Sequence, residues 1–143
     1  MAAATTRAVG YIRTATTTAA NKEHCTAGQA QRIRRYCSDQ GMTLVGALVD
    51  HGLAGDGIDR TGLRDALSLL REGHADVLVV VNVSRLSRSV EALAQLVATH
   101  FADGTRALVS LDEALDTRTA NGRFVLSLLQ VLARWEAGVI GHA

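Results

Sequence analysis

The side chains in this sequence that are best suited to chemistry are arginines. The chain has fourteen of them against a single lysine, Lys22. A guanidinium is always charged, and its forked N–H groups match two oxygens of a phosphate. Arg13 follows a short apolar run, and Arg85 and Arg88 follow another at a spacing of one helical turn. Such groups could bind phosphate and stabilise the negative charge that develops during in-line attack on a phosphodiester.

Two simpler interpretations of these arginines remain open. A coding bias towards Ala and Arg accounts for the same count. A single arginine is also, as a rule, a solvated surface charge. This interpretation is kept for arginines on predicted exposed helical faces, although the first three listed here could touch a duplex backbone: Arg32, Arg34, Arg35, Arg64 and Arg71.

Alternating strands and helices must position the arginines. The hydrophobic pattern predicts strands at 8–13, 44–48, 75–83 and 106–111, and helices at 26–40, 61–72, 87–101 and 119–137. The continuous apolar run at 77–81 is typical of a strand buried on both faces. We therefore predict a single α/β domain over residues 1–143, with a mostly parallel central sheet, helices on both faces and a long C-terminal helix. Ligands gather at the carboxyl ends of such strands, where Arg13, Arg85 and Arg88 fall.

Composition limits the classes of protein to which this chain can belong. Its 143 residues, 48% hydrophobic and 20% charged, are typical of one globular domain. No apolar run is long enough for a membrane span and the N-terminus lacks a signal-peptide pattern, so we expect a cytoplasmic protein. A net charge of +1 gives no general affinity for nucleic acid, and 3% aromatic residues are too few for a single-strand binder. Cys25 and Cys37 have no partners at zinc spacing, and no glycine-rich nucleotide loop is present, so we expect neither metal nor cofactor.

Four segments resemble one protein family in order along the chain. They are Tyr11-Ile12-Arg13-Thr14-Ala15, Asp59-Arg60-Thr61-Gly62-Leu63, Ser84-Arg85-Leu86-Ser87-Arg88, and Leu111-Asp112-Glu113 with Asp116-Thr117-x-Thr119-Ala120-x-Gly122-Arg123-Phe124. Gln29 and the pair Tyr36-Cys37 match as well, at a spacing of seven. Together they resemble the N-terminal catalytic domain of serine recombinases, the resolvase/invertase family of DNA strand exchangers. The resemblance implies a resolvase-like fold, a phosphate-binding cluster of Arg13, Arg60, Arg85 and Arg88, and accessory roles for Tyr11, Gln29, Ser84 and Glu136.

The sequence departs from the family at the position that matters most for its chemistry. In the family, a serine two residues after the first arginine attacks the DNA phosphate, and here that position holds Ala15. A methyl group cannot act as a nucleophile. Thr14 and Thr16 flank the position, but side chains alternate along an extended chain, so both should point away from it. Three other family positions also differ: Ser84 replaces an aspartate, Ala54 a serine, and Ala137 an arginine. We therefore expect that this chain does not cleave DNA strands. Ala15 could be the natural residue of a degenerate family member or an engineered substitution, and the three additional departures favour natural degeneracy.

The last predicted helix carries an apolar stripe that could pair two protomers. Phe124, Leu128, Leu132 and Trp135 recur at helical spacing, and the corresponding helix of the family forms the dimer. The family's helix-turn-helix module is not present in these residues, so we expect weak or sequence-nonspecific binding to the DNA backbone.

Three functions follow from these observations. The first is an inactive recombinase-like domain that binds DNA and regulates a related recombinase by mixed dimerisation or acts as a homodimeric scaffold. The second is the catalytic domain of an active site-specific recombinase that carries an inactivating substitution. The third is a binder of small phosphate compounds.

Overall fold

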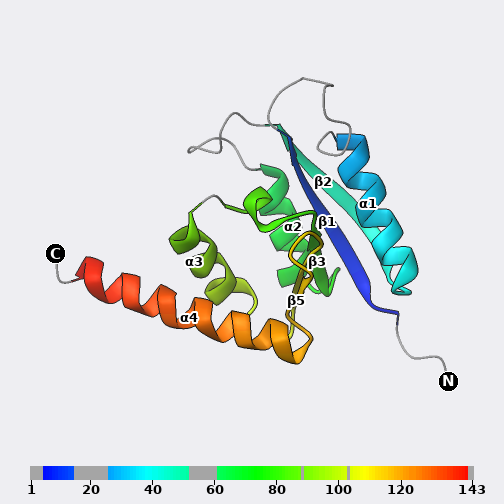
Figure 1. Ribbon diagram of the computed structural model, residues 1–143. Helices are drawn as coiled ribbons and strands as arrows, with labels where there is room; N and C mark the ends of the chain where they lie inside the picture. Colours follow the sequence, from blue (N-terminus) through cyan, green and yellow to red (C-terminus); the bar gives the residue numbers. More distant parts are fainter. Residues whose placement is uncertain (1–4, 15–25, 52–60, 88, 103, 142–143) are drawn as a thin grey trace.

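Five strands form one sheet in the computed structural model, which describes residues 5–14, 26–51, 61–87, 89–102 and 104–141, with the backbone alone for 51, 133 and 135–141 (Figure 1). The strands are β1 (Arg7–Thr14), β2 (Thr43–His51), β3 (Val77–Val80), β4 (Ala107–Ser110) and β5 (Leu115–Asp116). Their order across the sheet is β2-β1-β3-β4-β5. The first four are parallel, and β5 is antiparallel to β4. The mostly parallel sheet was predicted correctly.

Helices cover both faces of this sheet, as the sequence pattern predicted. One face packs against α1 (Thr26–Asp39), and the other packs against α2 (Thr61–Arg71), α3 (Val90–His100) and α4 (Ala120–Gly141). In β1, Ala8 and Ile12 face α1, whereas Val9 and Tyr11 face the other helices. This alternation is the ordinary period of a strand, so β1 contributes side chains to both cores. Cys37 is buried on the inner side of α1.

The sequence predicted one helix over 87–101 after β3, and the structure differs from this prediction. A short 3₁₀ helix, η1 (Val83–Arg85), comes first, and α3 begins only at Val90. The reason lies in two serines. Ser89 caps α3, its Oγ accepting from the Ala92 N–H at 3.2 Å, and Ser87 Oγ accepts from the Ser89 N–H at 3.1 Å. Short hydroxyl side chains favour such local bonds over a helix interior. The segment that carries Ser84 and Arg85 is therefore the 3₁₀ helix and not the start of α3.

The final helix is the longest element, and it begins with a very close approach to β5. Thr119 caps α4: its Oγ1 accepts from the Gly122 N–H at 3.0 Å and donates to the Asp116 carbonyl at 2.8 Å. A Cβ on Gly122 would lie 1.8 Å from that carbonyl oxygen, so only glycine fits there. The sequence predicted a helix over 119–137, and the structure extends it to Gly141. The two-residue strand β5 was not predicted, because it is too short to show periodicity.

Candidate functional site

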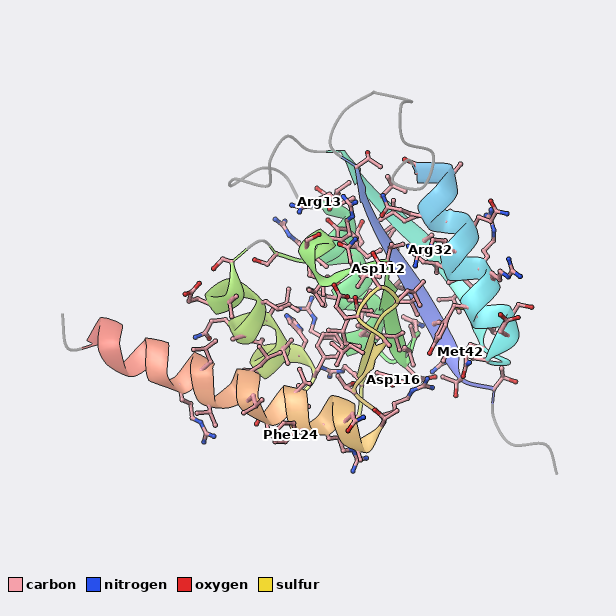
Figure 2. The ribbon with its side chains drawn as sticks, viewed as in Figure 1. Arg13, Arg32, Met42, Asp112, Asp116 and Phe124 are labelled. Carbon is pink, nitrogen blue, oxygen red and sulfur yellow. The ribbon has the colours of Figure 1, made fainter. Side chains whose placement is uncertain are left out.

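Reciprocal hydrogen bonds join the end of β1 to the 3₁₀ helix after β3. Arg13 Nη2 donates to the Ser84 carbonyl at 2.5 Å, and Arg85 Nη1 donates to the Arg13 carbonyl at 3.1 Å. Gln29 Nε2, from α1, donates to the same Arg13 carbonyl at 3.1 Å. Four of the predicted site residues therefore lie together at the carboxyl edge of the sheet, where Figure 2 shows Arg13. In this arrangement Arg13 is 7% exposed and Arg85 is half-buried.

A polar network continues from Ser84 across the turn that follows β4. The Ser84 hydroxyl donates to Asn82 Oδ1, and Asn82 Nδ2 donates to Asp112 Oδ2 at 3.1 Å. The other Asp112 oxygen accepts from Arg32 Nη2 of α1 at 2.8 Å. The β4–β5 turn thus holds the segment that carries Arg85 and fastens it to α1. Arg32, expected to be a free surface charge, is half-buried in this ion pair.

A buried carboxylate, Asp50, fixes the other side of the site. Tyr11 OH donates to Asp50 Oδ2 at 2.7 Å. The backbone N–H groups of Gly62 and Leu63 donate to the two Asp50 oxygens at 2.7 and 3.1 Å, so Asp50 caps α2. A Cβ on Gly62 would lie 2.8 Å from Asp50 Oδ1, which explains the glycine in this motif. These bonds join the end of β2 to the first turn of α2.

Sequence reasoning missed Asp50 as a site residue. The sequence carries only a weak signal for Asp50, which is a carboxylate directly after an apolar strand. In the fold its side chain is 8% exposed. A buried carboxylate needs hydrogen-bond donors, and the pairing of β1 with β2 brings the Tyr11 hydroxyl to Asp50 as one of them. Arg13 is the register partner of Asp50 in β2, which places Tyr11 two residues away on the same face of β1.

The chemical capacity of this edge is to hold an anion. Two permanently charged guanidinium groups, from β1 and η1, donate to main-chain carbonyls where parallel strands end. Hydrogen bonds to the main chain fix their position before any ligand arrives, which is the kind of preorganisation that phosphate chemistry uses. Within the described ranges, no three His, Cys, Asp or Glu side chains gather as a metal site would require. No described helix combines the length and apolar character needed to cross a bilayer.

Several predicted site residues lie outside the described residues. These are Ala15, Arg60 and Arg88, so their arrangement around Arg13 stays a prediction. Glu136 and Trp135 lie in α4, where the structure describes their backbone alone. The site that can be built from coordinates therefore consists of Arg13, Gln29, Ser84 and Arg85, with Tyr11 behind them.

The apolar stripe of α4 is largely exposed. Phe124 is 65% exposed and Leu128 54%, and Val131, which the sequence stripe did not include, is 57% exposed. Leu132 is half-buried instead. The opposite side of the helix packs on the core through Leu126 and Leu129. Figure 2 shows Phe124 on the side of α4 away from the sheet. The exposed stripe is therefore Phe124, Leu128 and Val131. It contains Val131 where the sequence predicted Leu132.

Comparison with known proteins agrees with the motifs. The family described as "Resolvase, N terminal domain" matches residues 8–143. Transposon Tn917 resolvase of Enterococcus faecalis is 32% identical over 111 residues, 71% of this chain and 59% of the relative. The DNA-invertase of Escherichia phage P1 is 32% identical over 132 residues, 92% of this chain and 63% of the relative. The chain thus spans about three fifths of the length of these two relatives.

Solved structures show the same fold. The N-terminal catalytic domain of TP901-1 integrase superposes with a TM-score of 0.81 at 26% identity, covering 93% of this chain and 98% of that domain. A resolvase family site-specific recombinase from Streptococcus pneumoniae shares the fold alone, with a TM-score of 0.72 at 18% identity over 94% of this chain and 90% of that one. With the family match over nearly its whole length, the chain belongs to the resolvase N-terminal domain family of serine recombinases.

Proposed function

We propose that this chain is a serine-recombinase domain that binds the DNA backbone and dimerises but does not cleave strands. The observation that carries the proposal is the reciprocal bonding of Arg13 and Arg85 at the carboxyl edge, two residues before Ala15. The relatives are named resolvases, invertases and recombinases, so the ligand of this edge is a DNA phosphate. A DNA ligand agrees with the cytoplasmic location that the sequence leads us to expect. Ala15 offers no oxygen for a covalent link to that phosphate.

Binding through this edge should be electrostatic and independent of sequence. Each phosphate that a guanidinium neutralises contributes about −0.9 to the slope of log affinity against log salt. We expect Arg85→Gln to reduce this slope by about one per protomer in fluorescence anisotropy with a labelled duplex. Arg64→Gln is the matched control, because Arg64 is exposed on α2 and its side chain takes no part in the hydrogen bonds described for the site. Equal slopes for the native chain and Arg85→Gln, in a variant that melts like the native chain, would contradict the proposed site.

Dimerisation through α4 is the second part of the proposal. Fully burying a large apolar side chain is worth roughly 1.5–3 kcal/mol. Because Phe124, Leu128 and Val131 are only 54–65% exposed in the single chain, burying all three in each of two protomers gives a total of about 5–11 kcal/mol. This total is of the same size as the association cost of about 4–15 kcal/mol, so we expect a weak dimer. The partner is a second copy of this chain or a related recombinase that presents the same helix.

A second candidate is the catalytic domain of an active recombinase carrying one inactivating substitution. The intact frame around the site favours it, because Tyr11, Asp50 and Gln29 still make the bonds that hold β1 and α2. Ala15→Ser separates the two candidates. A covalent DNA adduct formed by this variant would support the second candidate, in which loss of the serine hydroxyl alone inactivates the domain. Its absence would support a domain that has also lost function at other positions, such as Ser84.

A further inference from the structure

A second group of arginines surrounds a cavity at the other end of the sheet. The cavity has a volume of about 530 Å³. Arg106 lines it from the residue before β4, Arg118 from the turn after β5, and Arg123 from the first turn of α4. Figure 2 shows Asp116, next to this cavity, at the opposite end of the sheet from Arg13. The cavity is therefore separate from the site described above.

Only one of these three arginines is held by a carboxylate in the structure as described. Arg118 donates two hydrogen bonds to Asp116, from Nε to Oδ1 at 2.9 Å and from Nη2 to Oδ2 at 2.7 Å. Arg106 Nη1 makes a long contact of 3.5 Å to the His100 carbonyl, which neutralises no charge. None of the described residues that line the cavity is acidic, although Asp103, which adjoins it in sequence, lies outside the described residues. Among the described lining residues, Arg106 and Arg123 therefore carry positive charge that no carboxylate of the lining neutralises.

The rest of the lining suits a small anion with an apolar part. Thr117 and Gln130 add neutral polar groups that can donate hydrogen bonds, whereas the Ser127 hydroxyl already donates to the Arg123 carbonyl at 3.0 Å. Phe101 and Leu126, both largely buried, form an apolar floor. The volume lies within the range of roughly 300–1,000 Å³ that is usual for small-molecule sites. Guanidinium groups from three segments can approach one phosphate from different directions.

We propose that this cavity is a second anion site, which takes a phosphate-bearing ligand between Arg106 and Arg123 with Arg118 beside them. The ligand would join α4 to the start of β4. The phosphate could come from a small phosphorylated molecule or from a nucleic-acid backbone. The proposal rests on the cavity alone and does not depend on DNA binding at the carboxyl edge.

The test is a titration of the ¹⁵N-labelled chain followed by the amide signals of Thr117 and Ser127. Inorganic phosphate, deoxyadenosine monophosphate and a short duplex are the three probes. We expect saturable shifts at these amides, and a loss of affinity of roughly tenfold in Arg123→Gln, as removal of one charge-assisted contact implies. Arg134→Gln is the matched control, since Arg134 is exposed on the same helix and does not line the cavity. Melting curves establish that both variants fold.

The outcomes separate the sources of the phosphate and can overturn the site. Tighter binding of the monophosphate than of the duplex identifies a small ligand, and the reverse identifies a nucleic-acid backbone. Shifts that do not saturate, or that persist equally in Arg123→Gln and Arg134→Gln, overturn the proposal. Should Arg123→Gln fail to fold, Arg106→Gln provides the same reading. The Arg85→Gln anisotropy experiment is independent, so failure of one site leaves the other untouched.

Discussion

Removing the Tyr11 hydroxyl should destabilise the domain more than a conservative change normally does. In Tyr11→Phe, the buried Asp50 carboxylate loses a donor at 2.7 Å and keeps only the two N–H groups of α2. A hydrogen bond to a charged group contributes about 1.5–3 kcal/mol. For a domain of this length, about 3–5 °C of melting temperature corresponds to 1 kcal/mol. We therefore expect the midpoint to fall by roughly 5–15 °C in thermal unfolding followed by circular dichroism.

The chain offers a matched control in Tyr36, its other tyrosine. Tyr36 is half-buried on α1 and hydrogen-bonds the Arg118 side chain, so solvent can replace much of what Tyr36→Phe removes. Its cost should stay below about 1 kcal/mol. A double-mutant cycle of Tyr11→Phe with Asp50→Asn should give a coupling energy of about 1–2 kcal/mol. Additive effects, or a larger loss in Tyr36→Phe than in Tyr11→Phe, would refute the assigned role of Asp50.

Three further expectations follow from the described contacts. Gly122→Ala should lower the melting temperature far more than Gly46→Ala, because its Cβ would collide with the Asp116 carbonyl whereas nothing lies within 4 Å of the Gly46 position; equal melting shifts would refute this. Phe124→Glu should yield monomers in sedimentation at unchanged stability, since this side chain is already exposed, and a dimeric variant would argue against the α4 interface. Burial would raise the pKa of Asp116, but hydrogen bonds from Arg118 outweigh this effect and lower that pKa. The native chain should therefore be more stable than Arg118→Gln by the full amount above about pH 4, and this difference in unfolding free energy should shrink as the pH falls further. A difference that grows on acidification would contradict this expectation.

The sequence predicted the layers of the fold well because its apolar periods are long and clear. Residues 77–81 are uniformly apolar, and Val77 to Val81 proved to be buried on both faces. The start of α3 was predicted less well, because the bonds made by Ser87 and Ser89 depend on local geometry that hydrophobic periodicity does not record. The strand β5 escaped prediction because its two residues are too few to show periodicity.

The candidate site divides in the same way. The motifs placed Arg13 and Arg85 at one edge, since parallel strands must end together, and the structure brings both there. Neither Asp50 nor the cavity around Arg123 could be found from spacing. Both arise from contacts between segments distant in sequence, and single-sequence patterns carry little information on such contacts. The reason for Gly122 likewise became clear only once α4 was seen to press against β5.

The most direct test of the central claim is a covalent-adduct assay on the native chain. The protein is incubated with supercoiled plasmid, the reaction is stopped with denaturant, and protein-linked DNA is separated on a denaturing gel. Because position 15 carries a methyl group, we predict no cleaved plasmid and no DNA attached to protein. Nicked or cut plasmid with a covalent adduct, mapped by peptide analysis to Thr14 or Thr16, would contradict the account.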